Sequence, residues 1–434
     1  MIFLNDSCVD IDALSRQMLM YFNIPLQQFE RLDLADDFGI LKCYITLKAN
    51  EMFCPMCKRK IVGNGTYKRK VIIPNKAFEH TSVYFNIRRY RCNNCKLSIS
   101  DNYNLTPSKQ VMSYSLIQQV MSLLSSSSET FKSCANICGI SDNTVIRIFD
   151  RHCHIPRTHF PEAMCIDEVY TKNNNFKAKY SCLLYDFHNK SLIDVLPSRR
   201  KEYLGYYFSH ISAFERNKVK YICMDMYRPY YLIAKRYFKK AIICVDSFHV
   251  VKHLNDDLNK IRIRITKRYD PTSIEYYLLN KFNYLLFDRS IILNGEPKFN
   301  RKLNQYLNYE QILRMILSID EDLDKGYYLK ELYSTFNLEA THQEAKDKLD
   351  DIINEFKLAD IYEYTEFIRL LNNWHDEIIN SFIRYKGKRI NNGIAEAINE
   401  TVSTIIYNTK GIKNNKRRRK RIMYVVNKTG FTLY

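Results

Sequence analysis

The stretch Val219-Lys-Tyr-Ile-Cys-Met-Asp225-Met-Tyr-Arg-Pro-Tyr-Tyr231 decides the fold of this chain. Its first half is a short apolar run that ends abruptly in one carboxylate, and an amphipathic helix can begin at Arg228-Pro229. Such a run, bounded by a turn, predicts a strand buried on both faces of an α/β sheet. Ligands of these sheets gather at the carboxyl ends of the strands, where Asp225 lies. Asp225 can equally cap the next helix, so a chemical role depends on partners elsewhere in the chain.

Other short elements surround this strand in a regular order. The pattern predicts three hairpin-connected strands, a helix, the strand before Asp225, a second helix and a last strand, at residues 163–169, 180–187, 191–196, 201–214, 221–224, 226–237 and 241–245. This is the order of the ribonuclease-H-like fold. In that fold the first and fourth strands are neighbours and each carries a carboxylate, and Asp167 and Asp225 occupy those places. Asp246 also follows a strand, and we interpret it as a helix cap or a partner of His249.

The composition indicates a polyanionic partner. The chain has 434 residues, enough for two to four domains, and carries 66 Lys+Arg against 47 Asp+Glu, a net charge of +19. Nucleic acid is the commonest such partner, and no apolar stretch approaches the ~20 residues that would span a bilayer. The acidic N-terminus, with Asp6, Asp10 and Asp12, does not resemble a secretory signal. We therefore expect a cytoplasmic protein whose thirteen cysteines are reduced.

Four cysteines have the spacing of a metal site. Cys54-Pro-Met-Cys57 and Cys92-Asn-Asn-Cys95 bracket an alternating segment, 81–88, that predicts a strand of a hairpin. Each C-x-x-C turn presents two thiolates on one side, as a structural Cys₄ zinc site requires, although a redox pair has the same spacing. The ribbon also carries the basic residues Arg88, Arg89 and Arg91, which suit phosphate contact or a solvated surface.

Helical periodicity follows from Ser108 to His154. Gly139-Ile-Ser141 interrupts it, and Ser141 can cap a further helix. Helix, short turn and capped helix make a helix-turn-helix, whose second helix would offer Asn143, Thr144 and Arg147 to a major groove. Helical corners of this kind also occur in proteins that do not bind DNA.

The remaining part of the chain, from residue 255 on, has a largely helical pattern. We expect no sheet strand between residues 255 and 385. The stretch 386–393 then breaks the helix, and a new helix at 394–407 carries Glu396 in its first turn, where a carboxylate is often only a partner of the helix dipole. The run Lys410–Arg421 contains no acid, and we interpret it as a helix lying against DNA through residues such as Lys416, Arg417, Arg418 and Arg419.

Several of these stretches together resemble the bacterial insertion-sequence transposases of the ISL3 type. The segments that carry the resemblance span nearly the whole chain: Ile166-Asp-Glu168, Met224-Asp-Met-Tyr227, Cys244-Val-Asp-Ser-Phe-His-Val-Val-Lys-His-Leu254 and Asn392-Gly-Ile-Ala-Glu396-Ala-Ile-Asn399. The zinc ribbon and helix-turn-helix precede them in the usual order of this DDE transposase family. One departure follows Asn399, where the family's basic helix and aromatic-Gly turn are replaced by Val402-Ser-Thr-Ile-Ile-Tyr407 and then Lys410-Gly-Ile412.

The resemblance implies a catalytic function. Asp167, Asp225 and Glu396 would form a D-D-E site holding two Mg²⁺ ions, because hard oxygen ligands suit Mg²⁺. The protein would bind the terminal inverted repeats of an insertion sequence and catalyse cleavage and strand transfer without a covalent intermediate. Its partners would be double-stranded DNA, as transposon ends and target, and a second copy of itself in a DNA-bound homodimer. A non-catalytic DNA-binding regulator, or a nuclease that cuts without joining, is the alternative.

These inferences combine into a multidomain α+β protein in which a helical insertion interrupts a ribonuclease-H-like α/β catalytic domain. The predicted segments are an N-terminal helical segment (1–38), a zinc ribbon (39–103), a helix-turn-helix (104–158), the first part of the catalytic core (159–256), the helical insertion (257–385), and the second part of the core with the basic C-terminal segment (386–434).

Overall fold

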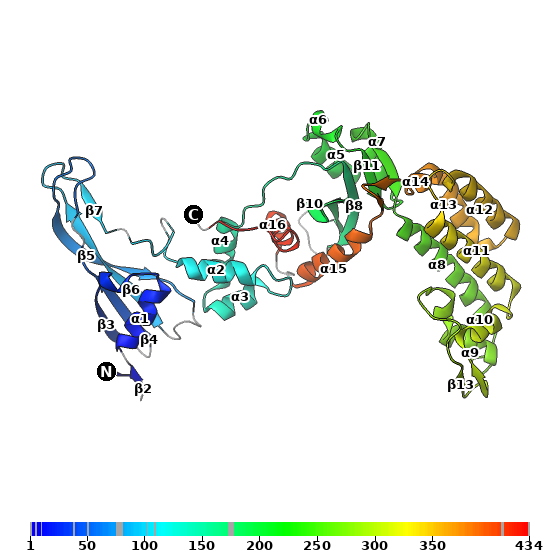
Figure 1. The fold of residues 1–434 in the computed structure, drawn as a ribbon, viewed down its shortest axis with the longest axis horizontal. Coiled ribbons are helices and arrows are strands. Elements are labelled where there is room, and N and C mark those ends of the chain that lie inside the picture. Colours follow the sequence, from blue (N-terminus) through cyan, green and yellow to red (C-terminus); the bar gives the residue numbers. More distant parts are fainter. Residues whose placement is uncertain are drawn as a thin grey trace. The chain divides into compact units, whose positions relative to one another are not determined.

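The structure is a computed structural model. It describes residues 2–4, 7–9, 11–37, 40–49, 52–74, 81–101, 103–107, 110–171, 178–408 and 412–432. The predicted starting points Gly39, Ser108 and Lys410 lie outside these ranges. The chain divides into two compact units, residues 1–156 with 404–434, and residues 157–403 (Figure 1). The segment predicted at 386–434 is thus divided between them.

The N-terminal part of the first unit is a β-sheet with one helix on it. Strands β3 (Phe29–Asp37), β4 (Ile40–Leu47), β6 (Thr81–Arg91) and β5 (Val62–Val71) lie in that order, and β7 (Ser98–Ser100) pairs with β6. Apolar residues alternate along β6 as predicted, so that Val83, Phe85 and Ile87 are buried. They pack with Met18 of α1 (Ile11–Tyr21).

The sequence pattern missed the strands that flank α1. We expected little besides one helix before residue 35, but β1 (Ile2–Leu4) pairs with β2 (Ser7–Val9), and β3 begins at Phe29. The reason is the composition of β3, Phe-Glu-Arg-Leu-Asp-Leu-Ala-Asp-Asp, whose side chains are all exposed or half-buried. An edge strand of this kind lacks the apolar face that identifies a strand.

Three short capped helices follow. They are α2 (Tyr114–Leu123), α3 (Phe131–Cys138) and α4 (Asp142–His152), and their caps Ser113, Thr130 and Ser141 accept backbone hydrogen bonds. Gly139 ends α3 with a φ of 65°, a left-handed conformation that glycine adopts without steric cost. This confirms the predicted turn between α3 and α4.

A C-terminal helix, α16 (Asn415–Val426), completes the core of this helix-turn-helix. Tyr424 is buried, lies edge-on to Phe149 with ring centroids 5.8 Å apart, and donates to the Met121 carbonyl at 2.9 Å. Arg421 is 1% exposed and donates to the backbone carbonyls of Leu124, Ser126 and Glu129.

The second unit contains a mixed five-stranded sheet in the order β10-β9-β8-β11-β12. Its strands β8 (Ala163–Tyr170), β9 (Tyr180–Asp186), β10 (Ser191–Leu196), β11 (Tyr221–Met224) and β12 (Ile242–Val245) confirm the predicted strands. β9 is antiparallel to β8 and β10, whereas β11 is parallel to both β8 and β12. The helices between strands are α5 (Lys201–Ser209), α6 (Ala213–Arg216) and α7 (Arg228–Tyr237).

Helices dominate the chain between β12 and residue 381. They are α8 (Ser247–Thr266), α9 (Ile274–Lys281), α10 (Tyr309–Leu317), α11 (Glu321–Glu339), α12 (Ala345–Ala359), α13 (Thr365–Asn373) and α14 (His375–Asn380). Their core is continuous with that of the sheet, since Leu254, Tyr333 and Phe367 join the same cluster as Met224. A hairpin whose strands have two residues each, β15 (Arg384–Tyr385) and β16 (Lys388–Arg389), then leads to α15 (Gly393–Asn408).

The expectation that this helical stretch holds no strand is wrong. β13 (Lys298–Asn300) pairs antiparallel with β14 (Gln305–Leu307). Strands of three residues are too short to show an alternating pattern. In the part of the chain that the structure describes, no helix is long and apolar enough to cross a membrane.

Candidate active site

Two of the predicted acids lie on neighbouring parallel strands. The register of β8 and β11 pairs Ile166 with Met224, so that Asp167 and Asp225 take the next position on each strand. Asp167 is 8% exposed and Asp225 is half-buried. The backbone N–H of Tyr227 donates to Asp225 at 3.1 Å. The first turn toward α7 therefore fixes the Asp225 carboxylate at this edge of the sheet.

Helix α15 contributes an amide that sequence reasoning did not assign. Asn399 donates through Nδ2 to Asp167 Oδ2 at 2.7 Å, and its Oδ1 accepts a hydrogen bond from the Tyr185 hydroxyl. Since Tyr185 donates to the oxygen, the amide nitrogen must face the carboxylate. Asn399 was visible as the last residue of the N-G-x-x-E-x-x-N segment, but nothing in the sequence indicated Tyr185.

Both carboxyl groups are shifted toward their protonated forms. Burial raises the pKa of Asp167, although the hydrogen bonds from the Glu168 backbone and Asn399 oppose the shift. Burial, followed by the negative charge of Glu168, raises the pKa of Asp225 to about 6. Carboxylates that repel one another in a desolvated position are stabilised by a cation.

Glu168 is held by its own partners. It forms an ion pair with Arg199 and accepts from the Tyr230 hydroxyl at 3.2 Å. The Arg199 guanidinium lies over the rings of Tyr180 and Tyr227, at 4.2 and 4.4 Å from their centroids. Arg199 therefore neutralises Glu168, and no sequence pattern predicted this role.

Asp246 serves as a cap. Its side chain is 2% exposed and accepts from the backbone N–H groups of Phe248, at the start of α8, and of Asn392 at 3.2 Å. His249 Nε2 lies 3.8 Å from Asp246 Oδ2. The interpretation of Asp246 as a cap and partner of His249 is confirmed.

Glu396 lies one turn before Asn399 in the first turn of α15, and its side chain is exposed. Among described residues, the one group of three or more potential metal ligands whose donor atoms all lie within 4.8 Å consists of cysteines. Asp167, Asp225 and Glu396 form no such group, so their carboxylate oxygens do not lie as close together as the four cysteine sulfurs do. Asn399, rather than Glu396, makes the direct contact from α15 to Asp167.

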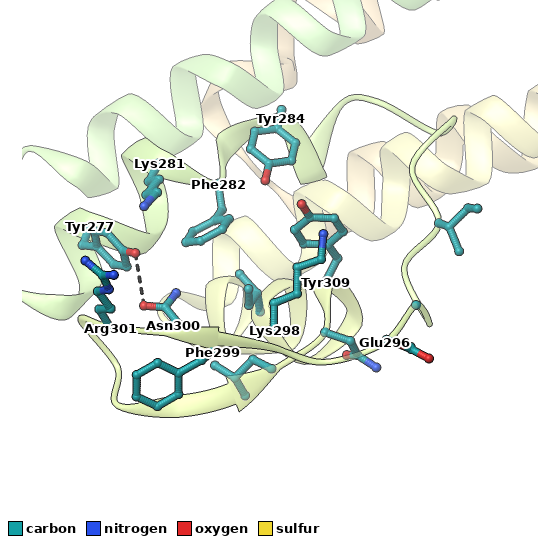
Figure 2. Close-up of a pocket in the computed structure, with 15 residues that line it drawn as sticks. Tyr277, Lys281, Phe282, Tyr284, Glu296, Lys298, Phe299, Asn300, Arg301 and Tyr309 are labelled. Carbon is teal, nitrogen blue, oxygen red and sulfur yellow. Dashed lines mark hydrogen bonds between the residues drawn. The ribbon is translucent and has the colours of Figure 1, made fainter.

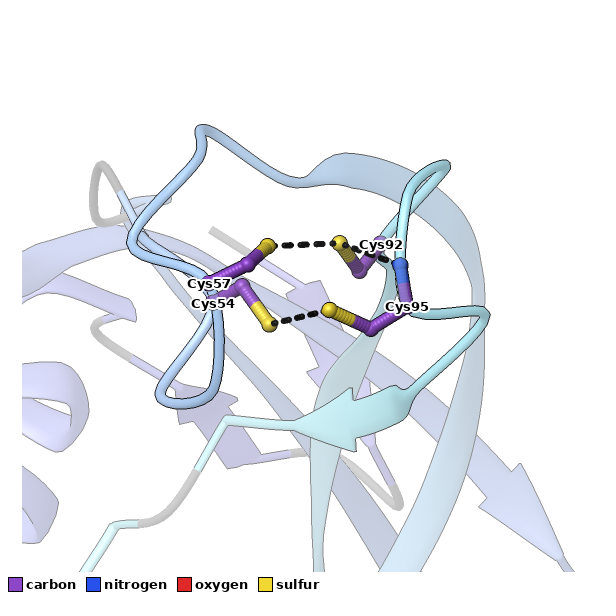
Figure 3. Close-up of side chains that lie close together, drawn as sticks. All are labelled: Cys54, Cys57, Cys92 and Cys95. Carbon is purple, nitrogen blue, oxygen red and sulfur yellow. Dashed lines mark hydrogen bonds between the residues drawn. The ribbon is translucent and has the colours of Figure 1, made fainter.

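The predicted four-cysteine site is assembled. Cys54, Cys57, Cys92 and Cys95 lie within 4.8 Å of one another, with sulfur–sulfur distances of 3.9 Å for Cys54–Cys95 and 3.5 Å for Cys57–Cys92 (Figure 3). These distances are too long for disulfides. A backbone hydrogen bond from Arg59, followed by the neighbouring thiols, lowers the pKa of Cys57 to about 6, and the same hydrogen bonding with Cys57 raises the pKa of Cys95 to about 12. Four cysteines gathered in this way can hold a metal ion.

The two turns that present these cysteines have the same backbone. Lys58 N–H donates to the Cys54 carbonyl and Lys96 N–H to the Cys92 carbonyl, each at 2.9 Å. Lys58 and Lys96 both have a positive φ, 58° and 59°. The repeated geometry shows that both halves of the site are built alike.

The exposed face of α4 carries the residues predicted for DNA recognition. Asn143 and Arg147 are exposed and Thr144 is half-buried, whereas Val145, Ile148 and Phe149 form the inner face. Arg147 donates to the Asn143 carbonyl at 3.3 Å, which directs its side chain along the helix surface.

Comparison with known protein families identifies two regions of the chain, one that contains the carboxyl groups and one that contains the helix-turn-helix. Residues 164–422, more than half of the chain, match the DDE-type ISL3 transposase family. Residues 103–153 match the helix-turn-helix domain of transposase family ISL3. The chain belongs to the ISL3 transposase family. No curated protein matches it. As an ISL3 transposase it binds DNA, and the match over α2–α4 associates DNA binding with the helix-turn-helix.

Two of the basic residues predicted to contact DNA in this ISL3 transposase have structural partners instead. Arg418 is 6% exposed and donates to the Ile412 carbonyl at 3.0 Å, and Arg417 forms an ion pair with Asp150 of α4. The Arg417 contact attaches α16 to α4, whereas the Arg418 contact holds the segment that leads into α16. Lys416 is exposed and Arg419 half-buried.

The ribbon arginines of the transposase divide in the same way. Arg88 is half-buried, pairs with Glu30, and donates to the Leu47 carbonyl, so it links β6 to the neighbouring strands. Arg89 and Arg91 are exposed, and Arg89 lies 4.7 Å above the Tyr67 ring. Fewer arginines of the ribbon are therefore available for phosphate contact than the sequence indicates.

Proposed function

We propose that the protein binds the terminal inverted repeats of an insertion sequence and catalyses metal-dependent cleavage and strand transfer of DNA. The observation that carries the proposal is a pair of carboxyl groups on adjacent parallel strands, the buried Asp167 in β8 and the half-buried Asp225 directly after β11. The order β10-β9-β8-β11-β12, with only β9 antiparallel to the rest, supports a ribonuclease-H-like core. The helical stretch before α15 would then be an insertion into that core.

Mg²⁺ fits the donor set at this edge. Asp167 and Asp225 are both desolvated at this edge of the sheet and both have raised pKa values, which favours a site that is completed by cations. We propose Asp167, Asp225 and Glu396 as the ligands of two ions. When bound, Mg²⁺ supplies activation of an attacking hydroxyl and stabilisation of the leaving oxygen.

The proposal for Glu396 rests on its position in α15. Residues three apart lie on one face of a helix, and Asn399 on that face bonds to Asp167. The exposed Glu396 side chain can change rotamer without loss of buried contacts. Asn399 and Tyr185 would meanwhile hold the Asp167 carboxylate in one orientation.

Zinc is the proposed ion of the four-cysteine site. A tetrahedral site with Zn–S bonds of about 2.3 Å has sulfur–sulfur edges of about 3.8 Å. The distances of 3.5 and 3.9 Å fit these edges. Zinc would hold together two turns that are connected by the antiparallel pair β5–β6.

DNA recognition is assigned to the first unit. Asn143, Thr144 and Arg147 would read base edges, while Arg89, Arg91, Lys416 and Arg419 would contact phosphates. A homodimer would bring two such units to the two ends of the element.

The deciding experiment uses purified protein, Mg²⁺ and DNA that carries the ends flanking the gene. Nicking at those ends, lost in Asp225→Asn, is the expected result. Binding of the ends without any cleavage would instead identify a non-catalytic regulator. Cleavage without joined products would identify a nuclease.

A further inference from the structure

A cavity lies under the β13–β14 hairpin, far along the chain from the carboxylates. It has a volume of about 670 Å³ and is bounded by the hairpin, α9, the 3₁₀ helix η3 (Asn283–Leu286) and the start of α10 (Figure 2). This volume is in the range of ligand sites. Every residue from 178 to 408 is described, so its lining is complete.

Aromatic rings form much of the wall. Tyr277, Phe282, Tyr284 and Tyr309 follow one another with ring centroids 5.7 to 6.2 Å apart. Phe299 of β13 lies at the rim of the cavity, and the strand register pairs it with Tyr306 on the face opposite to Lys298 and Leu307. Phe282 is buried and anchors the row, whereas Tyr284 is 37% exposed and presents accessible ring surface.

Positive charge accompanies the rings. Lys281, Lys298 and Arg301 line the cavity against a single acid, Glu296. The ammonium groups of Lys281 and Lys302 lie 5.2 and 5.1 Å from the Tyr277 ring centroid. Flat apolar surface with cations at its edge matches a ligand that combines an aromatic ring with a negative charge.

A second cavity in the same helical region has the opposite charge. It measures about 380 Å³ and is lined by Glu339, Asp351 and Glu355 against one cation, Lys348, with Tyr328 at its edge. A positive cavity is therefore a property of the hairpin and not of the helical region as a whole. Tyr328, 59% exposed, provides a matched control aromatic.

We propose that the hairpin cavity binds an unpaired base of a DNA strand, which stacks on Tyr284 while its phosphate faces Lys298. Bases within a duplex already stack on both faces, so only an unpaired base can use these rings. The inference rests on the proposed function for the identity of the polyanion as DNA. The proposed substrate thereby includes a DNA segment whose two strands are separated.

The test compares the affinity of the full-length protein for oligo-dT and for a duplex of equal length, without added Mg²⁺. Tyr284→Ala should weaken oligo-dT binding about tenfold, the contribution of one stacked base, and leave duplex binding unchanged. Tyr284→Trp should retain affinity and Tyr328→Ala should match the wild type. A thermal melt of each variant identifies any loss of fold.

Photocrosslinking gives a second readout that does not depend on a variant. Oligo-dT containing 5-iodouracil should crosslink to peptides with Tyr284 or Tyr309. Unchanged oligo-dT affinity in Tyr284→Ala, equal losses for single strand and duplex, or crosslinks confined to residues outside the cavity would overturn the proposal. Neither readout involves cleavage or the element's ends, so failure here leaves the transposase proposal intact, and inactivity with ends and Mg²⁺ leaves this one intact.

Discussion

At the scale of single residues, Asp225 is a carboxyl group of the candidate active site whose pKa the fold raises to about 6. Its position after an apolar run was evident from sequence, because such runs form buried strands. The partners that surround it were not evident. Tyr185 of β9, Arg199 of the loop before α5 and Asn399 of α15 reach the site, and such contacts depend on packing that no local pattern encodes.

The raised pKa of Asp225 predicts a pH effect on stability in the metal-free protein. The folded state keeps the proton up to about pH 6, whereas the unfolded chain loses it near 3.8, so stability should fall as pH rises across this interval. Asp225→Asn removes the free-energy cost of desolvating an ionised Asp225 in the folded state. The variant should therefore have a higher Tm than the wild type at neutral pH but not below pH 3.8. Added Mg²⁺ should stabilise the wild type more than this variant. Equal Tm values at neutral pH would contradict the prediction.

Glu396→Gln should abolish cleavage while the fold and DNA binding persist, because an amide is a weak ligand for Mg²⁺. Glu400→Gln is the matched control, an exposed glutamate of the same helix. Gel assays of end cleavage and of end binding check both. Full cleavage by Glu396→Gln would remove Glu396 from the proposed ligand set and leave Glu168 and Glu400 as candidates.

At the scale of elements, long or strongly apolar segments were predictable and short or charged ones were not. The five strands of the second unit emerged from apolar runs, and the helix-turn-helix from periodicity and caps. β3 was missed because its residues are polar, and β13 and β14 because each has three residues. α16 was predicted as a DNA-facing helix, since a buried arginine looks the same in sequence as a solvated one.

The burial of Arg421 predicts a stability effect separate from DNA binding. Arg421→Ala would leave several carbonyls without their donor, and the free energy of unfolding should fall by about 3 kcal/mol. Lys416→Ala, exposed on the same helix, should preserve stability but reduce the salt dependence of DNA binding by about one charge. Denaturant titrations and binding at several salt concentrations measure the two effects. A stable Arg421→Ala variant would refute the structural role.

The cysteine cluster predicts a metal stoichiometry. Purified protein should contain about one zinc per chain, by four-ligand coordination. Cys54→Ser/Cys92→Ser should lose it, and Cys43→Ala, a buried cysteine of β4 outside the cluster, should retain it. Elemental analysis measures the zinc content of each variant. Zinc retained by the double variant would exclude these cysteines as its ligands.

At the scale of the whole molecule, the helix-turn-helix needs the C-terminal segment. A fragment of residues 1–156 lacks Tyr424 and Arg421, so its helix-turn-helix should melt at a lower temperature than that of the intact chain. Adding a peptide of residues 404–434 should raise the melting temperature, which calorimetry can follow. No response to the peptide would mean that α2–α4 are self-sufficient.

The discontinuity of the first unit has a consequence for the moment at which the protein becomes able to bind DNA. Its first 156 residues emerge early from the ribosome, but α16 emerges only after residues 157–403 have been synthesised. At roughly 5–20 residues per second, this interval lasts about 10 to 50 s. A nascent or prematurely terminated chain therefore lacks a finished helix-turn-helix core and should compete poorly for transposon ends. Occupancy of the ends would be reserved for chains that also carry Asp167, Asp225 and Glu396.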